Sequence, residues 1–300
     1  MFETTDVTDS TLRVQILSFT CSVLRATPIP PLHVIRPLLH SIIIPSIDSP
    51  KCAHSALTAT FFFTFESKEA PQRESYLLEV FQCQPFLASI VEHANRTAQI
   101  KISEMARKVI ENLSNTTVKD YAEKLLTLDI STCLKSQLLS HKPQTILSAM
   151  SIITNIGATS KRAVQNFLET DVYVSVCRTY ARICRKDLVR EAVYNAKHAI
   201  IAASGQQLES LIHAGILLIL CDMLLDIKEG DVECVEVALT ALYLLLNKCP
   251  SVTVYDEVIR IVLELNGWKL VDRCRNHKDA RIKEKADRMN VAGIRAKHWK

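Results

Sequence analysis

The ten cysteines and nine histidines are the residues of this chain with the widest range of possible chemistry. The cysteines lie at positions 21, 52, 83, 133, 177, 184, 221, 234, 249 and 274. None of them forms a C-x-x-C pair, the spacing by which zinc sites place two ligands in one turn. No two histidines have ligand spacing on one helix either. We therefore expect no metal site, and we interpret the cysteines as small apolar core residues of a protein from a reducing compartment.

Signatures of catalysis are also absent from the sequence. It contains no phosphate-binding G-x-x-x-x-G-K-S/T loop, no G-x-S-x-G nucleophile elbow, no H-E-x-x-H pair and no calcium loop. The carboxylates Glu229, Asp231 and Glu233 stand close together, but their surroundings are typical of a solvated polar turn. We expect a protein without enzymatic activity and without a cofactor.

The composition identifies the elements that carry these residues. Only 6 of the 300 residues are glycine, about 2 %, against a usual share near 7 %. Sandwiches and nucleotide-binding α/β folds need glycine for turns and phosphate loops, so the low glycine content favours an all-helical protein. The longest apolar run, residues 216–225, includes Asp222 and is much shorter than the roughly 20 residues of a membrane-spanning helix. The polar start MFETTDVTDS does not resemble a signal peptide, so we expect no membrane partner.

Apolar residues at helical spacing recur along the chain as a repeated unit of a short helix, an apolar helix and a long third helix. We predict the long third helices at residues 12–25, 52–65, 102–115, 145–158, 188–203, 232–247 and near 278–291. Equivalent positions on the first six (19, 58, 108, 151, 194 and 241) are 39, 50, 43, 43 and 47 residues apart. Armadillo and HEAT units are roughly 40–47 residues long, and such units stack because one alone cannot bury its apolar face.

We therefore predict an all-α armadillo-repeat right-handed superhelix of six to seven repeats. It forms a single domain over residues 1–300, with repeats ending near 25, 65, 115, 158, 203, 247 and 291 and a basic tail at 292–300. The prolines concentrated in the first third predict more helix breaks there. The dipeptide Ser204-Gly205 ends one long helix, so we expect Gly205 to adopt the left-handed conformation of a helix C-terminus.

Three segments resemble the armadillo domain of the importin-α family, the adapters that carry proteins with nuclear localisation signals. Residues 190–225, REAVYNAKHAIIAASGQQLESLIHAGILLILCDMLL, resemble a central repeat unit of that family. Residues 18–39 resemble a unit with a proline-rich turn, and residues 267–287 resemble the closing repeat. The resemblance covers the second half of the family domain, without the basic arm that binds importin-β, so we do not expect importin-β as a partner.

The resemblance implies a peptide-binding groove along the third helices. In that family a Trp and an Asn four residues apart share one helix face; the Asn binds the peptide backbone, and the Trp rings clasp Lys or Arg stems. The matching pairs here are Phe19 and Val23, Thr58 and Phe62, Lys108 and Asn112, Ser151 and Asn155, Tyr194 and His198, and Ala241 and Leu245. Of the Trp and Asn of the family, only Asn112 and Asn155 are kept. We predict that signal peptides contact Phe19, Lys108, Asn112, Ser151, Asn155, Glu191, Tyr194 and His198.

Three of these peptide-binding assignments have alternatives. Asn155 could contact a peptide or form a hydrogen bond between repeats, and Tyr194 and His198 could be packing residues. Because every Trp is lost, and each cation–aromatic contact contributes about 0.5–2 kcal/mol, we expect weakened peptide binding. The resulting hypothesis is a nuclear import adapter of the cytoplasm and nucleus. The alternative is an interaction scaffold that has lost signal binding.

The charge distribution separates the end of the chain from the rest. Residues 268–300 hold 11 Lys and Arg against 4 Asp and Glu, which leaves 25 against 28 for residues 1–267. Arg281, Lys285 and Arg288 form a positive stripe at helical spacing, which is either a solvated capping face or a surface for an acidic partner such as an export factor. Nucleic acid is not an expected partner, because only Trp299 offers a ring for base stacking near this stripe.

Overall fold

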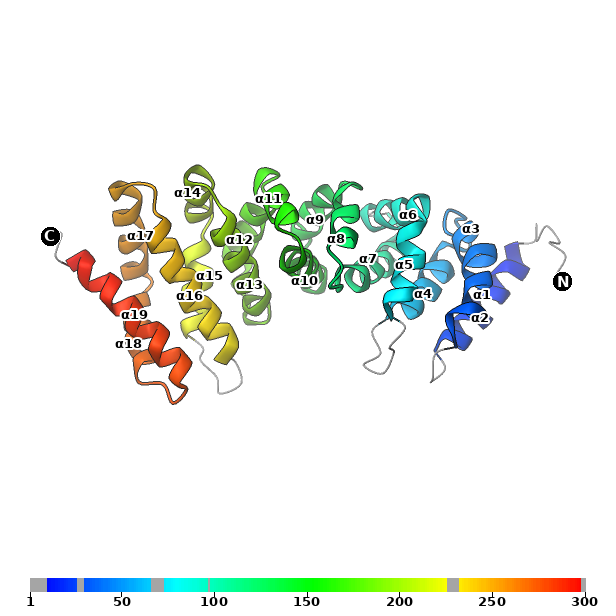
Figure 1. Ribbon diagram of the computed structural model, residues 1–300. Coiled ribbons are helices and arrows are strands. Elements are labelled where there is room, and N and C mark those ends of the chain that lie inside the picture. Colours follow the sequence, from blue (N-terminus) through cyan, green and yellow to red (C-terminus); the bar gives the residue numbers. More distant parts are fainter. Residues whose placement is uncertain (1–9, 26–29, 66–72, 97, 226–231, 298–300) are drawn as a thin grey trace. The chain divides into compact units, whose positions relative to one another are not determined.

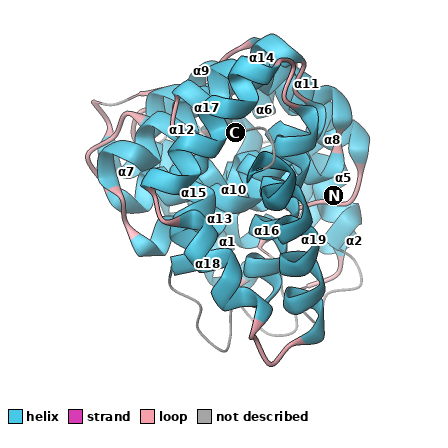
Figure 2. Cartoon of the chain, turned by 90° about the vertical axis from the view of Figure 1, so that its left-hand side faces the viewer, coloured by secondary structure: helices cyan, strands magenta, loops and turns pink. Residues whose placement is uncertain are grey.

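The computed structural model describes residues 10–25, 30–65, 73–96, 98–225 and 232–297, and within these ranges the chain forms helices and turns but no strand (Figure 2). The all-α class is therefore confirmed. Contacts within the chain group it into two compact units, Met1–Ser136 and Gln137–Lys300, which are described one at a time. The single domain over residues 1–300 stays a prediction.

The first unit contains helices α1 to α8 and most of α9 (blue to green in Figure 1). Their bounds are α1 Ser10–Leu24, α2 Leu32–Leu38, the π-helical turn η1 Leu39–Ile43, α3 Ile44–Ser46, α4 Ala53–Thr64, α5 Arg73–Gln82, α6 Gln84–Asn95, α7 Ile100–Ser114, α8 Lys119–Leu126 and α9 Ile130–Leu138. Pro37 inside α2 and Pro45 in α3 flank the π-helical turn, as expected where a proline removes a backbone donor. The predicted helix breaks in the first third are thus confirmed.

The second unit contains the end of α9 and helices α10 to α19 (green to red in Figure 1). Their bounds are α10 Pro143–Thr159, α11 Lys161–Glu169, α12 Val172–Ile183, α13 Lys186–Ala202, α14 Gly205–His213, α15 Ile216–Leu225, α16 Val232–Lys248, α17 Val252–Glu264, α18 Gly267–Arg275 and α19 Ala280–Lys297. Helix α19 continues into the predicted tail at 292–300, so residues 292–297 are helical and the last three lie outside the described residues.

Each predicted long third helix corresponds to a helix of the structure. These are α1, α4, α7, α10, α13, α16 and α19, and their bounds agree with the sequence periodicity to within a few residues, except at the C-terminal end of α19. Helix α16 shows why the periodicity succeeds. Its apolar residues at helical spacing, Val235, Leu239, Leu242 and Leu246, are buried, and so are Ala238, Ala241 and Leu245 beside them. A helix that is apolar over so wide a face must be covered by neighbours on several sides.

Long-range hydrogen bonds pin helices of one repeat to the ends of helices in the preceding repeat. The Lys248 ammonium at the end of α16 donates to the carbonyls of Ile200, Ile201 and Ala203 at the end of α13, at 2.8, 2.9 and 3.0 Å. Carbonyls in the last turn of a helix lack partners within that helix, and a cation there also complements the helix dipole. Arg182 and Arg273 make the same kind of contact, with the carbonyls of Leu138 and Leu225.

The turn between α13 and α14 corrects one expectation. Gly205 does not have a positive φ; it is the first residue of α14, and Ser204 before it forms a capping box with Gln207. A Cβ at position 205 would lie 2.9 Å from the Cβ of Pro250, so packing against that proline requires the glycine. Gly215, between α14 and α15, does take a positive φ of 98°.

The cysteines are free thiols, and seven of the ten are buried. Their place in the core agrees with the interpretation as small apolar residues, while Cys184 is exposed and Cys83 and Cys249 are half-buried. Burial raises the pKa of the Cys177, Cys221 and Cys274 thiols, so they remain protonated at neutral pH.

Within the described part of the chain, no single helix combines the length and the apolar character of a membrane span. Helices α14 and α15 meet those requirements only as a pair that is bent by 61°.

Candidate functional site

The third helices of the second unit pack in chain order, α10 against α13, α13 against α16, and α16 against α19 (Figure 1). This order brings the predicted site residues onto consecutive helices. Ser151 and Asn155 lie on α10, and Glu191, Tyr194 and His198 lie on α13. All five side chains are half-buried, as expected for residues at the edge of a packed face rather than in the core.

Tyr194 and Glu233 form a direct link between α13 and α16. The Tyr194 hydroxyl donates a hydrogen bond of 2.8 Å to Oε1 of Glu233. Burial and this bond raise the pKa of the phenol, so Tyr194 remains a donor at any physiological pH. Glu233 belongs to the first turn of α16 and not to a polar turn as predicted, although it is exposed as expected of a solvated residue. Glu229 and Asp231 lie outside the described residues.

Glu236 lies one turn after Glu233 on α16, and Glu191 lies one turn before Tyr194 on α13. We call Glu191, Glu233 and Glu236 the acidic strip. Glu233 is exposed, and the Glu236 side chain is 28 % exposed. Sequence reasoning included Glu191 but missed Glu233 and Glu236. A usable signal existed, since Glu233 follows Tyr194 by 39 residues, close to one repeat.

His198 is held against the end of α10. Its side chain lies near Gly157 of that helix. Burial, with a smaller contribution from the charge of Lys197, lowers the pKa of this imidazole. The neutral ring adds no positive charge beside the acidic strip. Gly157 is needed here for space, because a Cβ would lie 2.9 Å from the Tyr173 hydroxyl and 3.6 Å from Nδ1 of His198.

Asn195, which the sequence analysis did not select, is the completely buried polar residue of this face. Its Nδ2 donates to the carbonyl of Met150 on α10 and to that of Glu191 on its own helix, both at 3.0 Å. Its Oδ1 has no hydrogen-bond partner among the described residues. The bond to Met150 fixes how α13 lies against α10, because a buried amide donor needs an acceptor. A buried Asn next to the aromatic position looks in sequence like any polar helix residue.

We call the paired third-helix positions that are predicted to contact a peptide the ladder. The ladder residues of the first unit divide into two groups. Phe19 on α1 is 68 % exposed, and Lys108 on α7 is exposed as well. Asn112, in contrast, donates from Nδ2 to the carbonyl of Phe61 and to Oγ1 of Thr64, both at 3.2 Å. These bonds join α7 to the last turn of α4. The predicted peptide-binding amide of Asn112 is therefore used within the protein.

Thr58 and Phe62 on α4 are also engaged. The Thr58 hydroxyl donates to the carbonyl of His54, and the Arg25 guanidinium lies 4.6 Å from the centre of the Phe62 ring. A cation over an aromatic face is the contact that the ladder is expected to offer a peptide. Here a residue of the same chain makes it.

No family model and no curated protein matches the sequence. The structure is similar to the designed armadillo repeat protein YIII(Dq)4CqI, with a TM-score of 0.65 and 17 % identity over 83 % of this chain and 98 % of that one. The chain has the armadillo-repeat fold. The prediction of an all-α armadillo solenoid is thereby confirmed.

Two further designed armadillo structures are similar at the same level. One is a computationally designed armadillo repeat protein for modular peptide recognition, with a TM-score of 0.66 and 19 % identity over 83 % of this chain and 98 % of that one. The other, YIII(Dq.V1)4CPAF, is in complex with the peptide (KR)4 and has a TM-score of 0.65 and 17 % identity over 83 % and 97 % of the two chains. At these identities the likeness establishes the armadillo fold alone.

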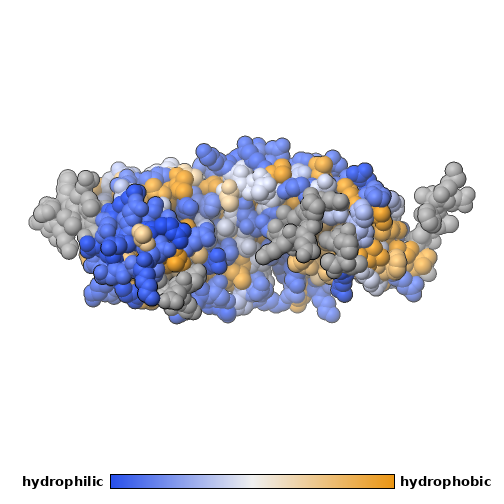
Figure 3. Space-filling view, turned by 60° about the horizontal axis from the view of Figure 1, so that its bottom comes forward, coloured by the Kyte–Doolittle hydropathy of each residue, from blue (hydrophilic) through white to orange (hydrophobic). Residues whose placement is uncertain are grey.

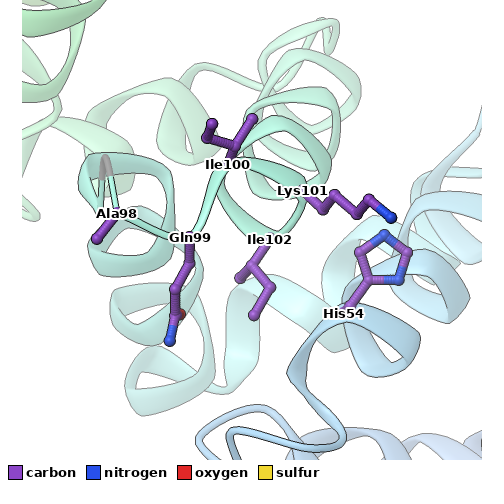
Figure 4. Close-up of a pocket in the computed structure, with 6 residues that line it drawn as sticks. All are labelled: His54, Ala98, Gln99, Ile100, Lys101 and Ile102. Atoms are coloured by element: carbon purple, nitrogen blue, oxygen red, sulfur yellow. The ribbon is translucent and has the colours of Figure 1, made fainter.

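In the part of the armadillo chain that the structure describes, no group of three His, Cys, Asp or Glu side chains could hold a metal ion. A hollow of about 400 Å³ lies between the starts of α4 and α7 in the first unit, lined by His54 and residues 98–102. Figure 4 shows Lys101 extended toward His54 at its rim. None of the predicted site residues lines this hollow.

The last armadillo repeat has a strongly polar surface over α18 and α19 (Figure 3). Much of its predicted positive stripe is paired within the protein. Two of its three residues are paired, Arg288 with Glu284 at 2.5 Å and Arg281 with Asp279 at 3.1 Å. Arg275 on α18, which is not part of the stripe, pairs with Asp287 at 2.9 Å. Such exposed pairs contribute little to stability, but they lower the net positive charge that the surface offers to an acidic partner. Trp299 lies outside the described residues.

Proposed function

We propose that this armadillo protein binds extended basic peptides along α10, α13 and α16 of its second unit. The observation that carries the proposal is the hydrogen bond between Tyr194 on α13 and Glu233 on α16, which places an aromatic ring beside a carboxylate of the neighbouring third helix. A ring next to carboxylates suits a Lys or Arg side chain, since the ring attracts the cation and packs on its stem while an acid receives its charge. Ser151 and Asn155 on α10 add polar groups on the adjacent helix.

A structural neighbour supports this chemistry. The designed armadillo protein in complex with (KR)4 has the same fold and a peptide of alternating Lys and Arg. In our proposal the natural ligands are nuclear localisation signals, and the protein is an importin-α-like import adapter that moves between cytoplasm and nucleus. The resemblance of residues 190–225 and 267–287 supports this finer assignment. An export factor at the last repeats belongs to the same proposal.

Fluorescence anisotropy with a labelled (Lys-Arg)4 peptide tests the binding step. The charge-neutralising pair Glu233→Gln with Glu236→Gln should weaken binding about tenfold or more. Asp256→Asn with Glu264→Gln is the matched control, because it removes the same charge from α17 of the same unit and should change the affinity less than threefold. The proposal is wrong if wild type binds the peptide no better than an acidic peptide of equal length, or if both pairs weaken binding equally.

A second function is favoured by a different observation. Asn112 and Phe62 are engaged within the first unit, so two ladder positions that would read a signal peptide are occupied by the protein itself. A scaffold that has lost signal binding would show this pattern. Asn155→Ala, on α10 of the proposed surface, distinguishes the two functions. A signal reader loses affinity for a simple basic localisation peptide, whereas the scaffold binds partners without basic motifs and is insensitive to this substitution.

A further inference from the structure

Helix α19 places a cation of the protein itself beside the acidic strip. Arg281 lies in the first turn of α19, which packs along α16. Its Nη1 is 3.9 Å from Oε2 of Glu236, and the charges of both Glu236 and Glu233 act on the guanidinium. A basic side chain of the protein itself, that of Arg281, therefore lies beside the carboxylates that the proposed peptide would bind.

Asp279 holds this guanidinium in position. Its Oδ1 accepts hydrogen bonds from the backbone amide of Arg281 at 2.9 Å and from Nε at 3.3 Å, while its Oδ2 lies 3.1 Å from Nη2. Nη1 is left to point at Glu236. The planar fork of five donors lets one arginine serve two carboxylates at once.

The contact is easily broken. The Arg281 side chain is 62 % exposed, and an exposed ion pair gains little in water because solvent screens it. A second cation could therefore take over Glu236 while Arg281 remains bonded to Asp279 or turns into solvent. Arg25 is a parallel case in the first unit, since this residue of the same chain occupies the face of Phe62 where a peptide cation is expected.

We propose that Arg281 is an internal competitor that occupies the acidic strip and is displaced when a basic peptide binds there. The inference rests on the proposed function, and it adds that α19 sets the threshold of affinity. A peptide with one basic side chain only exchanges one cation for another beside Glu236, so the number of ion pairs at the acidic strip does not increase. A peptide with several basic side chains also reaches Glu233, so the device selects for clustered basic residues.

The test compares three variants of the full chain with wild type, using (Lys-Arg)4 and a peptide with a single Arg. Arg281→Ala should tighten binding of both peptides, by about three- to tenfold for the single-Arg peptide and less for (Lys-Arg)4. Lys283→Ala is the matched control, because Lys283 is an exposed cation two residues away and its loss changes net charge equally. It should change either affinity less than twofold, and Arg281→Lys should lie between Arg281→Ala and wild type.

The outcomes separate this inference from the proposed function. If Arg281→Ala and Lys283→Ala tighten binding equally, bulk charge explains the effect and the internal competitor is refuted, while binding by wild type still supports the peptide surface. If Arg281→Ala alone tightens binding and high salt abolishes the difference, the competitor is supported. If neither peptide binds any variant, both proposals fall together.

Discussion

The Tyr194 hydroxyl on α13 donates a 2.8 Å hydrogen bond to Glu233 on α16, a residue 39 positions further along the chain. The bond joins the middle of α13 to the first turn of α16, two consecutive third helices, and it holds the aromatic ring at the border of the acidic strip. The same pair therefore has two separable parts, a hydroxyl that links repeats and a ring that can face a cation.

Substitution of Tyr194 separates those parts. Tyr194→Phe keeps the ring and should retain basic-peptide affinity within about threefold, with a loss of stability of about 0.5–1.5 kcal/mol from the missing hydrogen bond. Tyr194→Ala removes the ring and should weaken peptide binding about 2- to 30-fold. Anisotropy titrations and urea unfolding measure the two effects. Equal affinity of the Phe and Ala variants would show that the ring contributes nothing to binding.

The buried amide of Asn195 predicts sensitivity to an isosteric change. Asn195→Asp puts a carboxylate beside the carbonyls of Met150 and Glu191 and removes both donors, so it should destabilise the protein by about 3 kcal/mol or more at pH 7. Asn195→Ala should cost about 1–3 kcal/mol. Urea unfolding compares them with Asn247→Asp, which lies exposed on α16 and should cost less than 1 kcal/mol.

The deficit of Asn195→Asp should also depend on pH. Burial raises the pKa of a carboxyl above its unfolded value near 4, so the folded state binds the proton more tightly than the unfolded state. The penalty is then smallest below about pH 4 and grows as the pH rises through the interval between the two values. A penalty that stays constant from pH 3.5 to pH 7 would contradict the buried environment of this side chain.

Gly157 and Tyr173 should be energetically coupled. An added Cβ at 157 would lie 2.9 Å from the Tyr173 hydroxyl, which has no hydrogen-bond partner among the described residues. Gly157→Ala should therefore destabilise the protein by about 1–3 kcal/mol, although Ala is the better helix former. In a Tyr173→Phe background, which removes the hydroxyl, the same substitution should be neutral or stabilising. A double-mutant cycle by urea unfolding measures the coupling, and equal effects in both backgrounds would disprove it.

The buried Glu79 predicts the acid sensitivity of the first unit. Its carboxylate on α5 accepts a 3.0 Å hydrogen bond from Nε of Arg36 and lies 3.2 Å from Nε2 of His40. Burial by itself would raise the pKa of Glu79, but the hydrogen bonds and charges of Arg36 and His40 outweigh it, and the pKa is lowered. The stability from this cluster is therefore present above the ordinary pKa of a glutamate and lost as the pH falls through the folded-state value.

Arg36→Ala should cost about 1–3 kcal/mol at pH 7, and the cost should shrink as the pH falls through the lowered folded-state pKa of Glu79. Arg96→Ala is the control, since it breaks the exposed pair with Glu92 and should cost less than 1 kcal/mol. Thermal unfolding of both variants at a series of pH values is the measurement. An Arg36→Ala penalty that stays constant as the pH is lowered until the wild type unfolds would show that the carboxylate does not depend on this arginine.

The sequence by itself determined the helical class and the places of the seven third helices. Helical periodicity is a local property, and burial of Val235, Leu239 and Leu242 follows from it because an apolar stripe must be covered. The resemblance also placed Glu191, Tyr194 and His198 on one helix face, since i and i+4 positions are neighbours in any helix.

Only the tertiary structure decided which polar groups meet. Hydrogen bonds from Asn112 to Thr64, from Tyr194 to Glu233 and from Lys248 to the end of α13 cross 39 to 48 residues. Their formation depends on the exact rotation of one helix against the next, which a shift of a few ångströms changes. Spacing along the chain limits such partners to about one repeat apart. It cannot say whether an Asn amide points into a groove or toward a neighbouring helix, because both positions look alike in a single sequence.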